Sequence, residues 1–261
     1  MMSIRELEFT VSNLSQLLAL RLEALRKGGA VDANKVLQLA SDYRRLGCGL
    51  LLSTYDVEGF CGHLFLAADA YLQLLERKSM SPGLDPYYLA RSRAQPLLDA
   101  LAIGDMTLAG RIGERMEPRW AEGMEYEEDF CFFELLLLLA SSTGREERAL
   151  KCLARMERAL EGVAYPRYAA VAALVHRAPE RFEAALLALC EEWQSQVRQQ
   201  RQSGLGDQVF LLTEANVFIE GLALVRLASG RGMPTRSQYP LIPPAVLAER
   251  PWPHARVTLW G

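Results

Sequence analysis

The residues that could carry acid–base chemistry stand in one apolar stretch near the C-terminus, FLLTEANVFIEGLALVRLASGRG, which spans residues 210–232 and holds Glu214, Asn216 and Glu220. Two carboxylates can work as an acid–base pair only where the fold brings them together. Six residues correspond to about 600° around an α-helix, so Glu214 and Glu220 do not share one face well. A buried carboxylate is costly unless it is paired. We therefore expect both to lie at the helix boundary or to bond to a neighbouring arginine such as Arg226.

The histidines do not form a local metal motif, because His63, His176 and His254 are far apart in the sequence. His63 stands in an apolar helical pattern, which is more typical of a core or boundary residue than of a ligand. The chain also has no HExxH, P-loop or GxSxG motif and no glycine-rich fingerprint after a strand. We expect no catalytic, cofactor-binding or metal-binding residues, although distant residues could still converge into a site.

The cysteines favour buried thiols over a disulfide framework or a zinc site. They are odd in number, widely scattered, and without a CxxC pair. Each stands in an apolar helical context, and none has a nearby Cys or His suited to metal binding. We expect all of them to be reduced and to contribute only packing: Cys48, Cys61, Cys131, Cys152 and Cys190.

Composition predicts an all-α protein. Half of the 261 residues are hydrophobic, and Leu, Ala, Arg and Glu are prominent while β-branched residues are few. No Ser/Gly/Pro-rich linker divides the chain, so we expect a single domain over residues 1–261. The net charge of −3 argues against direct nucleic-acid binding through a broad basic face. Charged residues interrupt the N-terminal segment, and the densest apolar run, residues 130–140, is too short to span a bilayer. We expect a soluble cytoplasmic chain without a membrane segment.

Helical periodicity with short turns recurs along the chain. A first helix can begin at Asn13 and end at Gly28 and Gly29, and a second can run from Asp32 to Gly47. Acidic residues and prolines mark the first residues of further helices. The remaining expected segments are a stripe over 60–75, a segment divided at Pro96, a helix after Asp105, the pair 126–142 and 145–161, and helices from Pro166 and from Pro179 to about 202. This layout predicts antiparallel helical hairpins, in an irregular tetratricopeptide-like array or a compact bundle.

The segment EPRWAEGMEYEEDF, residues 117–130, is the strongest candidate for a binding surface because its acids outnumber its one arginine. In one interpretation these acids only favour the start of the helix that follows. In the other they form an electronegative patch that faces a basic partner, with the aromatic residues as anchors. The candidate residues are Trp120, Glu122, Glu125, Tyr126, Glu127, Glu128 and Asp129.

The C-terminal part resembles the immunity protein 49 family of bacterial polymorphic-toxin systems. The similarity extends over about residues 205–250. It lies in the apolar run Glu220–Leu224 with Leu227 and Ala228, then in Arg231, Gly232, Ser237, Tyr239 and Pro240, with Pro243 and Leu247 beyond. The resemblance is structural and carries over no catalytic or toxin-binding residue. It implies that the apolar helix belongs to the core.

The resemblance implies an immunity protein that binds a cognate secreted toxin domain stoichiometrically, without turnover and without a cofactor. Family members are encoded beside secreted toxins, often nucleases, so the expected partner is a DNA nuclease whose basic face an acidic inhibitor can cover. Two other hypotheses stay open: a helical-repeat adapter for a host protein or peptide, and an enzyme built from convergent residues. The sequence leaves the oligomeric state and the toxin's identity undetermined.

Overall fold

The computed structural model describes residues 4–28, 31–78, 81, 83–141, 144–204, 206–248 and 255–260. Within these residues the chain is built of helices and turns, and the one β-bridge joins Tyr239 to Ile242. The α-helices are α1 (Ile4–Lys27), α2 (Ala33–Thr54), α3 (Val57–Arg77), α4 (Gln95–Ala102), α5 (Met106–Arg115), α6 (Glu127–Ala140), α7 (Glu146–Ala159), α8 (Pro166–Val175), α9 (Pro179–Ser203), α10 (Gln208–Leu212), α11 (Ile219–Gly230) and α12 (Pro244–Leu247). Short 3-10 helices are η2 (Pro86–Leu89), η3 (Arg91–Arg93) and η4 (Glu214–Asn216). The predicted all-α class is confirmed.

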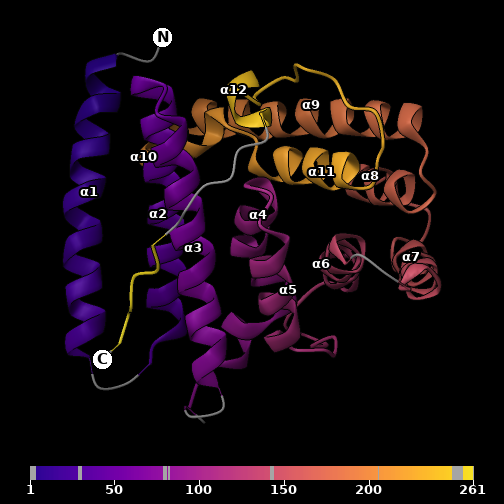
Figure 1. Ribbon diagram of the computed structural model, residues 1–261, viewed down its shortest axis with the longest axis horizontal. Coiled ribbons are helices and arrows are strands. Elements are labelled where there is room, and N and C mark those ends of the chain that lie inside the picture. The colour runs from indigo at the N-terminus through magenta and orange to yellow at the C-terminus, as the bar shows by residue number, and fades with distance from the viewer. Residues whose placement is uncertain are drawn as a thin grey trace.

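The first three helices form an antiparallel layer, with α1 at its outer edge (Figure 1). The pairs α6–α7 and α8–α9 form two further hairpins on the other side of the molecule. Helix α11 then returns to pack against α4, more than a hundred residues earlier in the chain. Contacts of that kind do not occur in a regular solenoid, where each repeat touches only its neighbours. The array of hairpins is therefore closed into a bundle by its C-terminal helix.

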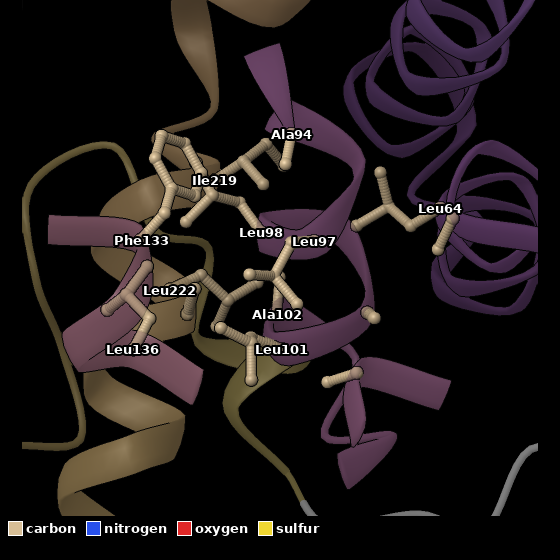
Figure 2. Close-up of a cluster of buried hydrophobic side chains, with 14 of the residues drawn as sticks. Leu64, Ala94, Leu97, Leu98, Leu101, Ala102, Phe133, Leu136, Ile219 and Leu222 are labelled. Carbon is tan, nitrogen blue, oxygen red and sulfur yellow. The ribbon is translucent and has the colours of Figure 1, made fainter. Parts of the chain in front are cut away.

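Helix α4 lies at the centre of the core, where helices from both halves of the chain meet (Figure 2). Every residue from Pro96 to Ala102 is buried, although α4 is only eight residues long. Leu64 of α3 approaches it from one side, and Phe133 of α6 and Leu222 of α11 approach from the other. A short helix buried on all sides derives its stability from packing and not from its own propensity.

Several helix boundaries follow the local signals in the sequence. Asp32 accepts the backbone N–H of Lys35 at 3.1 Å, and Asp105 accepts that of Leu108 at 2.8 Å, so both cap the helices that they precede. Helix α4 begins beside Pro96, which divides the segment as expected. Helices α8 and α9 likewise begin at a proline, in the first-turn position that needs no N–H donor.

Two of the predicted boundaries are wrong. The first helix begins at Ile4, so Asn13 lies within it; Gly29 lies outside the described residues. The second helix continues through Gly47 to Thr54. A Cβ at Gly47 would lie 3.1 Å from both the Phe60 carbonyl oxygen and the His63 Cβ atom. The glycine therefore permits close packing of α2 against α3 and does not end the helix.

The apolar stretch near the C-terminus is interrupted, not one continuous helix. It comprises α10, then η4, then α11. The segment Gln208–Gly230 has the length and mean hydropathy of a membrane span, but 67% of its most apolar window is buried inside this fold. Within α11, a Cβ at Gly221 would lie 2.3 Å from the Phe218 ring, so only glycine fits there without a shift. Gly232 follows the helix at a φ of 74°, a left-handed conformation that favours glycine.

The acids of this stretch are paired, but not with the expected arginine. Glu220 receives two hydrogen bonds from Arg167, at 2.9 and 2.7 Å, and Glu214 receives one from Arg44 at 3.2 Å. Arg226 instead donates to the backbone carbonyls of residues 246–248, at 2.7 to 3.1 Å. The proposed pairing with Arg226 is wrong because the arginines that neutralise these acids come from helices distant in sequence.

All five cysteines are free thiols, and only Cys152 is partly exposed. Two cysteines that are distant in the sequence lie close together in the fold. The Cys152 Sγ lies 3.6 Å from the carbonyl oxygen of Cys131, across the α6–α7 hairpin. The hydrogen bond from Cys152 lowers the pKa of the Cys131 thiol, against the opposing effect of burial. Twenty-one residues separate the two in sequence, so inspection of local spacing could not detect this contact.

Candidate functional site

The histidines that the structure describes belong to no group of potential metal ligands. His63 is half-buried and its Nδ1 lies 2.7 Å from the Gly59 carbonyl oxygen, while His176 is exposed; His254 lies outside the described residues. Among the described residues there is no group of three or more His, Cys, Asp or Glu side chains that could hold a metal ion. The surface at residues 120–129 is therefore the main candidate for a functional site.

The loop that carries Trp120 is folded against itself through Glu125. One Glu125 carboxylate oxygen accepts the Ala121 N–H at 3.1 Å, and the other accepts the Ser92 N–H at 2.8 Å. The Trp120 indole N–H donates to the Glu125 carbonyl oxygen at 3.1 Å. At the start of the loop, the Glu117 carbonyl accepts from Arg91 at 2.8 Å. The loop therefore has a fixed shape, because both of its ends are bound to η3.

The acids at the start of α6 are largely neutralised within the molecule. Glu127 lies 2.6 Å from the Nε of Arg155. Asp129 accepts from Arg167 and from the Tyr165 hydroxyl, each at 3.1 Å. Burial raises the pKa of Tyr165 to about 12, so its hydroxyl keeps the proton that it donates. These acids fix α6 against α7 and α8, in addition to favouring its N-terminus electrostatically.

A smaller set of candidate residues points to solvent. Tyr126 is 74% exposed and its neighbour Met124 is 42% exposed, in a sequence where most large apolar side chains are buried. Glu122 is exposed and Glu128 is partly exposed, and neither forms an ion pair with a described residue. Trp120 is packed partly against the core and contacts Arg155 through its ring face, 5.8 Å from the ring centroid. The outward surface of the segment therefore consists of two acids and two apolar side chains.

A cleft of about 600 Å³ opens beside this surface. Its walls come from five elements: η3, the first residue of α4, the loop, α6 and α8. The side chains that give it chemical character are Arg93, Gln95, Met124, Tyr126, Asp129 and Arg167. Burial opposes the charge on Arg167, but the attraction of Glu220 outweighs it and raises the pKa, so the guanidinium stays charged. The cleft thus offers both charge signs next to apolar surface, a combination that suits a protein side chain.

The sequence could not identify the arginines of this cleft. Arg93 stacks on the Tyr87 ring, 4.2 Å from its centroid, and Arg167 forms a bidentate pair with Glu220. Arg93 precedes the acidic segment by about thirty residues and Arg167 follows it by about forty. No local motif marks either residue, since their proximity results only from the packing of α6 between η3 and α8.

We expect Glu125→Ala to loosen the loop, because it removes the acceptor of two backbone N–H groups. Leaving such partly buried donors unsatisfied typically costs about 1–3 kcal/mol each. Trypsin should therefore cleave after the exposed Arg119 faster in this variant than in the parent. Glu122→Ala removes an exposed acid from the same loop and serves as the control. Equal cleavage rates in both variants would show that Glu125 does not maintain the shape of the loop.

Comparison with known proteins gives a family and no individual relative. A sequence model of the family described as immunity protein 49 matches residues 16–246, which is most of the 261-residue chain. The matched residues extend well beyond the C-terminal region of about 205–250 that carries the resemblance. Neither a curated protein nor a solved structure matches the chain. The chain therefore belongs to the immunity protein 49 family.

Proposed function

We propose that this chain acts in the cytoplasm as a stoichiometric inhibitor of one cognate toxin domain, a DNA nuclease, which it binds with the surface formed by the 120–129 segment and the adjacent cleft. Its family supports the immunity role. The observation that carries the choice of surface is the exposure of Tyr126 and Met124 on a loop of fixed shape beside a cleft of about 600 Å³. An aromatic anchor that is already ordered loses little conformational entropy on binding.

Fewer acids of the 120–129 segment are available to a nuclease than the sequence suggests. All seven candidate residues remain part of the proposed surface, but Glu125, Glu127 and Asp129 are engaged within the molecule. Glu122 and Glu128 are the acids available to a partner. A nuclease presents a basic face to its nucleic-acid substrate. Glu122 and Glu128 would attract that face and so accelerate the association of the nuclease with this chain. Most of the binding affinity would come from the exposed side chains of Tyr126 and Met124.

The first experiment tests immunity directly. The toxin encoded beside the gene for this chain is expressed in cells with and without the chain, and survival is measured. We expect rescue by the intact chain and, in vitro, loss of DNA cleavage at a 1:1 ratio. Failure to rescue would remove the immunity function. Rescue with undiminished DNA cleavage would retain the immunity function but exclude inhibition of a DNA nuclease.

Binding kinetics test the surface. Tyr126→Ala should shorten the lifetime of the toxin complex by about tenfold or more, because central aromatic anchors dominate interface energies. Reversal of charge at Glu122 and Glu128 should mainly slow association, and the effect should diminish at high salt. Tyr55→Ala, at a 62% exposed tyrosine in the α2–α3 turn, and charge reversal at Glu146 and Glu147 on α7 are matched controls. If the site variants and the controls bind alike, the toxin interface lies elsewhere.

A further inference from the structure

Helix α1 presents an apolar stripe on its outer face, away from the core. Its inner face packs through Leu7, Leu14, Leu18 and Leu25, which are all buried. On the outer face Phe9 is 69% exposed, Leu20 is 64% exposed and Leu17 is 38% exposed. The helix lies at one edge of the array (Figure 1), where a terminal element normally carries a polar outer surface. Phe9 and Leu20 are therefore the large apolar side chains that a second protein on this face would remove from water.

The spacing of the two most exposed apolar residues on the outer face of α1 is compatible with twofold symmetry. Phe9 and Leu20 are eleven residues apart, so they lie within about 20° of the same face and are separated by about 16 Å along the axis. When two copies of a helix pack antiparallel about a twofold axis, residues at equal distances on either side of the midpoint face each other. If the twofold axis passes between Leu14 and Ser15, Phe9 contacts the partner's Leu20, and Leu20 contacts the partner's Phe9. Both apolar contacts form at once.

The polar residues on the same stripe agree with this midpoint. Asn13 and Gln16 are symmetric about it, so the side-chain amides can meet at the centre. Arg5 and Glu23 are eighteen residues apart, about five full turns, so they lie on the same edge of the stripe. The midpoint between Arg5 and Glu23 falls within about 1 Å of the midpoint between Phe9 and Leu20. The same twofold axis therefore places Arg5 opposite the partner's Glu23. A parallel pair would instead place Arg5 against Arg5 and Glu23 against Glu23, which is repulsive.

We propose that α1 is the interface of a homodimer, in which the two copies of the helix pack antiparallel about a twofold axis. Such an interface is isologous, the commonest arrangement among soluble oligomers. A contact limited to one helix is smaller than a standard protein interface, so the dimer is weak and forms reversibly with increasing concentration. Since α1 and the 120–129 segment are on different parts of the array, the dimer does not depend on the function proposed above.

Sedimentation of the full-length chain tests the dimer. We expect a reversible monomer–dimer equilibrium between about 1 and 200 μM, the range expected for a small interface. Phe9→Glu and Leu20→Glu should each weaken association at least about tenfold. Both side chains are mostly exposed, so circular dichroism should show unchanged folding. A chain that stays monomeric throughout this range, or a dimer insensitive to both variants, would overturn the proposal.

Charge exchange tests the antiparallel register. Arg5→Glu and Glu23→Arg should each weaken the dimer, and the double variant should restore it, because the two residues then attract again across the interface. Glu8→Arg changes an exposed charge on α1 away from the stripe and should have no effect. If the double variant is no better than the single variants, the proposed pairing is wrong. If instead the parent is monomeric and Leu20→Glu abolishes toxin binding, α1 is a toxin surface and the homodimer is excluded.

Discussion

Replacing Asp99 with alanine should lower the free energy of unfolding by about 3–5 kcal/mol, because it leaves a buried arginine without its main partner. Asp99 is fully buried and Arg44 is 7% exposed at its side chain. The two form a bidentate ion pair, with N–O distances of 2.6 and 2.7 Å. Glu214 adds a third contact to Arg44 at 3.2 Å. The cluster therefore joins α2, α4 and η4 in the interior of the bundle.

Denaturant unfolding monitored by circular dichroism measures this effect. Arg45→Ala is the control, since Arg45 is the next residue on α2 and pairs mainly with Asp207, at 2.9 Å in a more exposed position, while its distance to Glu214 is 3.8 Å. Exposed pairs contribute about 0–1 kcal/mol, so the control should remain close to the parent. Arg44→Met combined with Asp99→Leu should recover much of the loss, because buried ion pairs can often be replaced by apolar side chains. If Asp99→Ala cost no more than the control, the pair would not stabilise the bundle.

This ion pair also marks the limit of what the sequence could predict. Boundaries set by local chemistry were predicted, as at Asp32, Asp105 and Pro179, because capping and first-turn proline depend on a few adjacent residues. Arg44 and Asp99 are 55 residues apart, and nothing in their local sequence identifies them as partners. The same holds for Arg167 and Glu220, which are 53 residues apart.

The candidate surface was predicted only as a group of residue types. The sequence identified an acidic segment with aromatic residues, and the structure assigns these residues to different positions. Tyr126 projects into solvent, whereas Glu125 is bound to the backbone of its own loop and to η3. Adjacent positions in a loop can face inward or outward without any periodicity in sequence, unlike those of a helix or strand. The cleft could not be predicted either, since its walls come from five separate elements.

Replacing Leu222 with alanine should destabilise the chain by about 2–5 kcal/mol, since it creates a cavity at the point where α11 closes the bundle. Leu222 is 1% exposed and lies in the cluster around α4, close to Leu101 and Leu136 (Figure 2). These two neighbours belong to α4 and α6, so the contact joins α11 to two helices from the middle of the chain. A cavity there cannot collapse by the shift of one side chain, so we expect a value in the upper half of the range. The family resemblance includes this residue.

Leu150→Ala is the control for this prediction, because it removes the same atoms from a leucine on α7 that is 48% exposed. Its effect should be below about 1 kcal/mol, as is usual for surface positions. Thermal and denaturant unfolding of both variants give the comparison. If Leu222→Ala unfolded at the same denaturant concentration as Leu150→Ala, α11 would not be packed on α4 in solution. The 208–230 segment would then expose its apolar face, and its membrane-like hydropathy would need an explanation other than burial in the core.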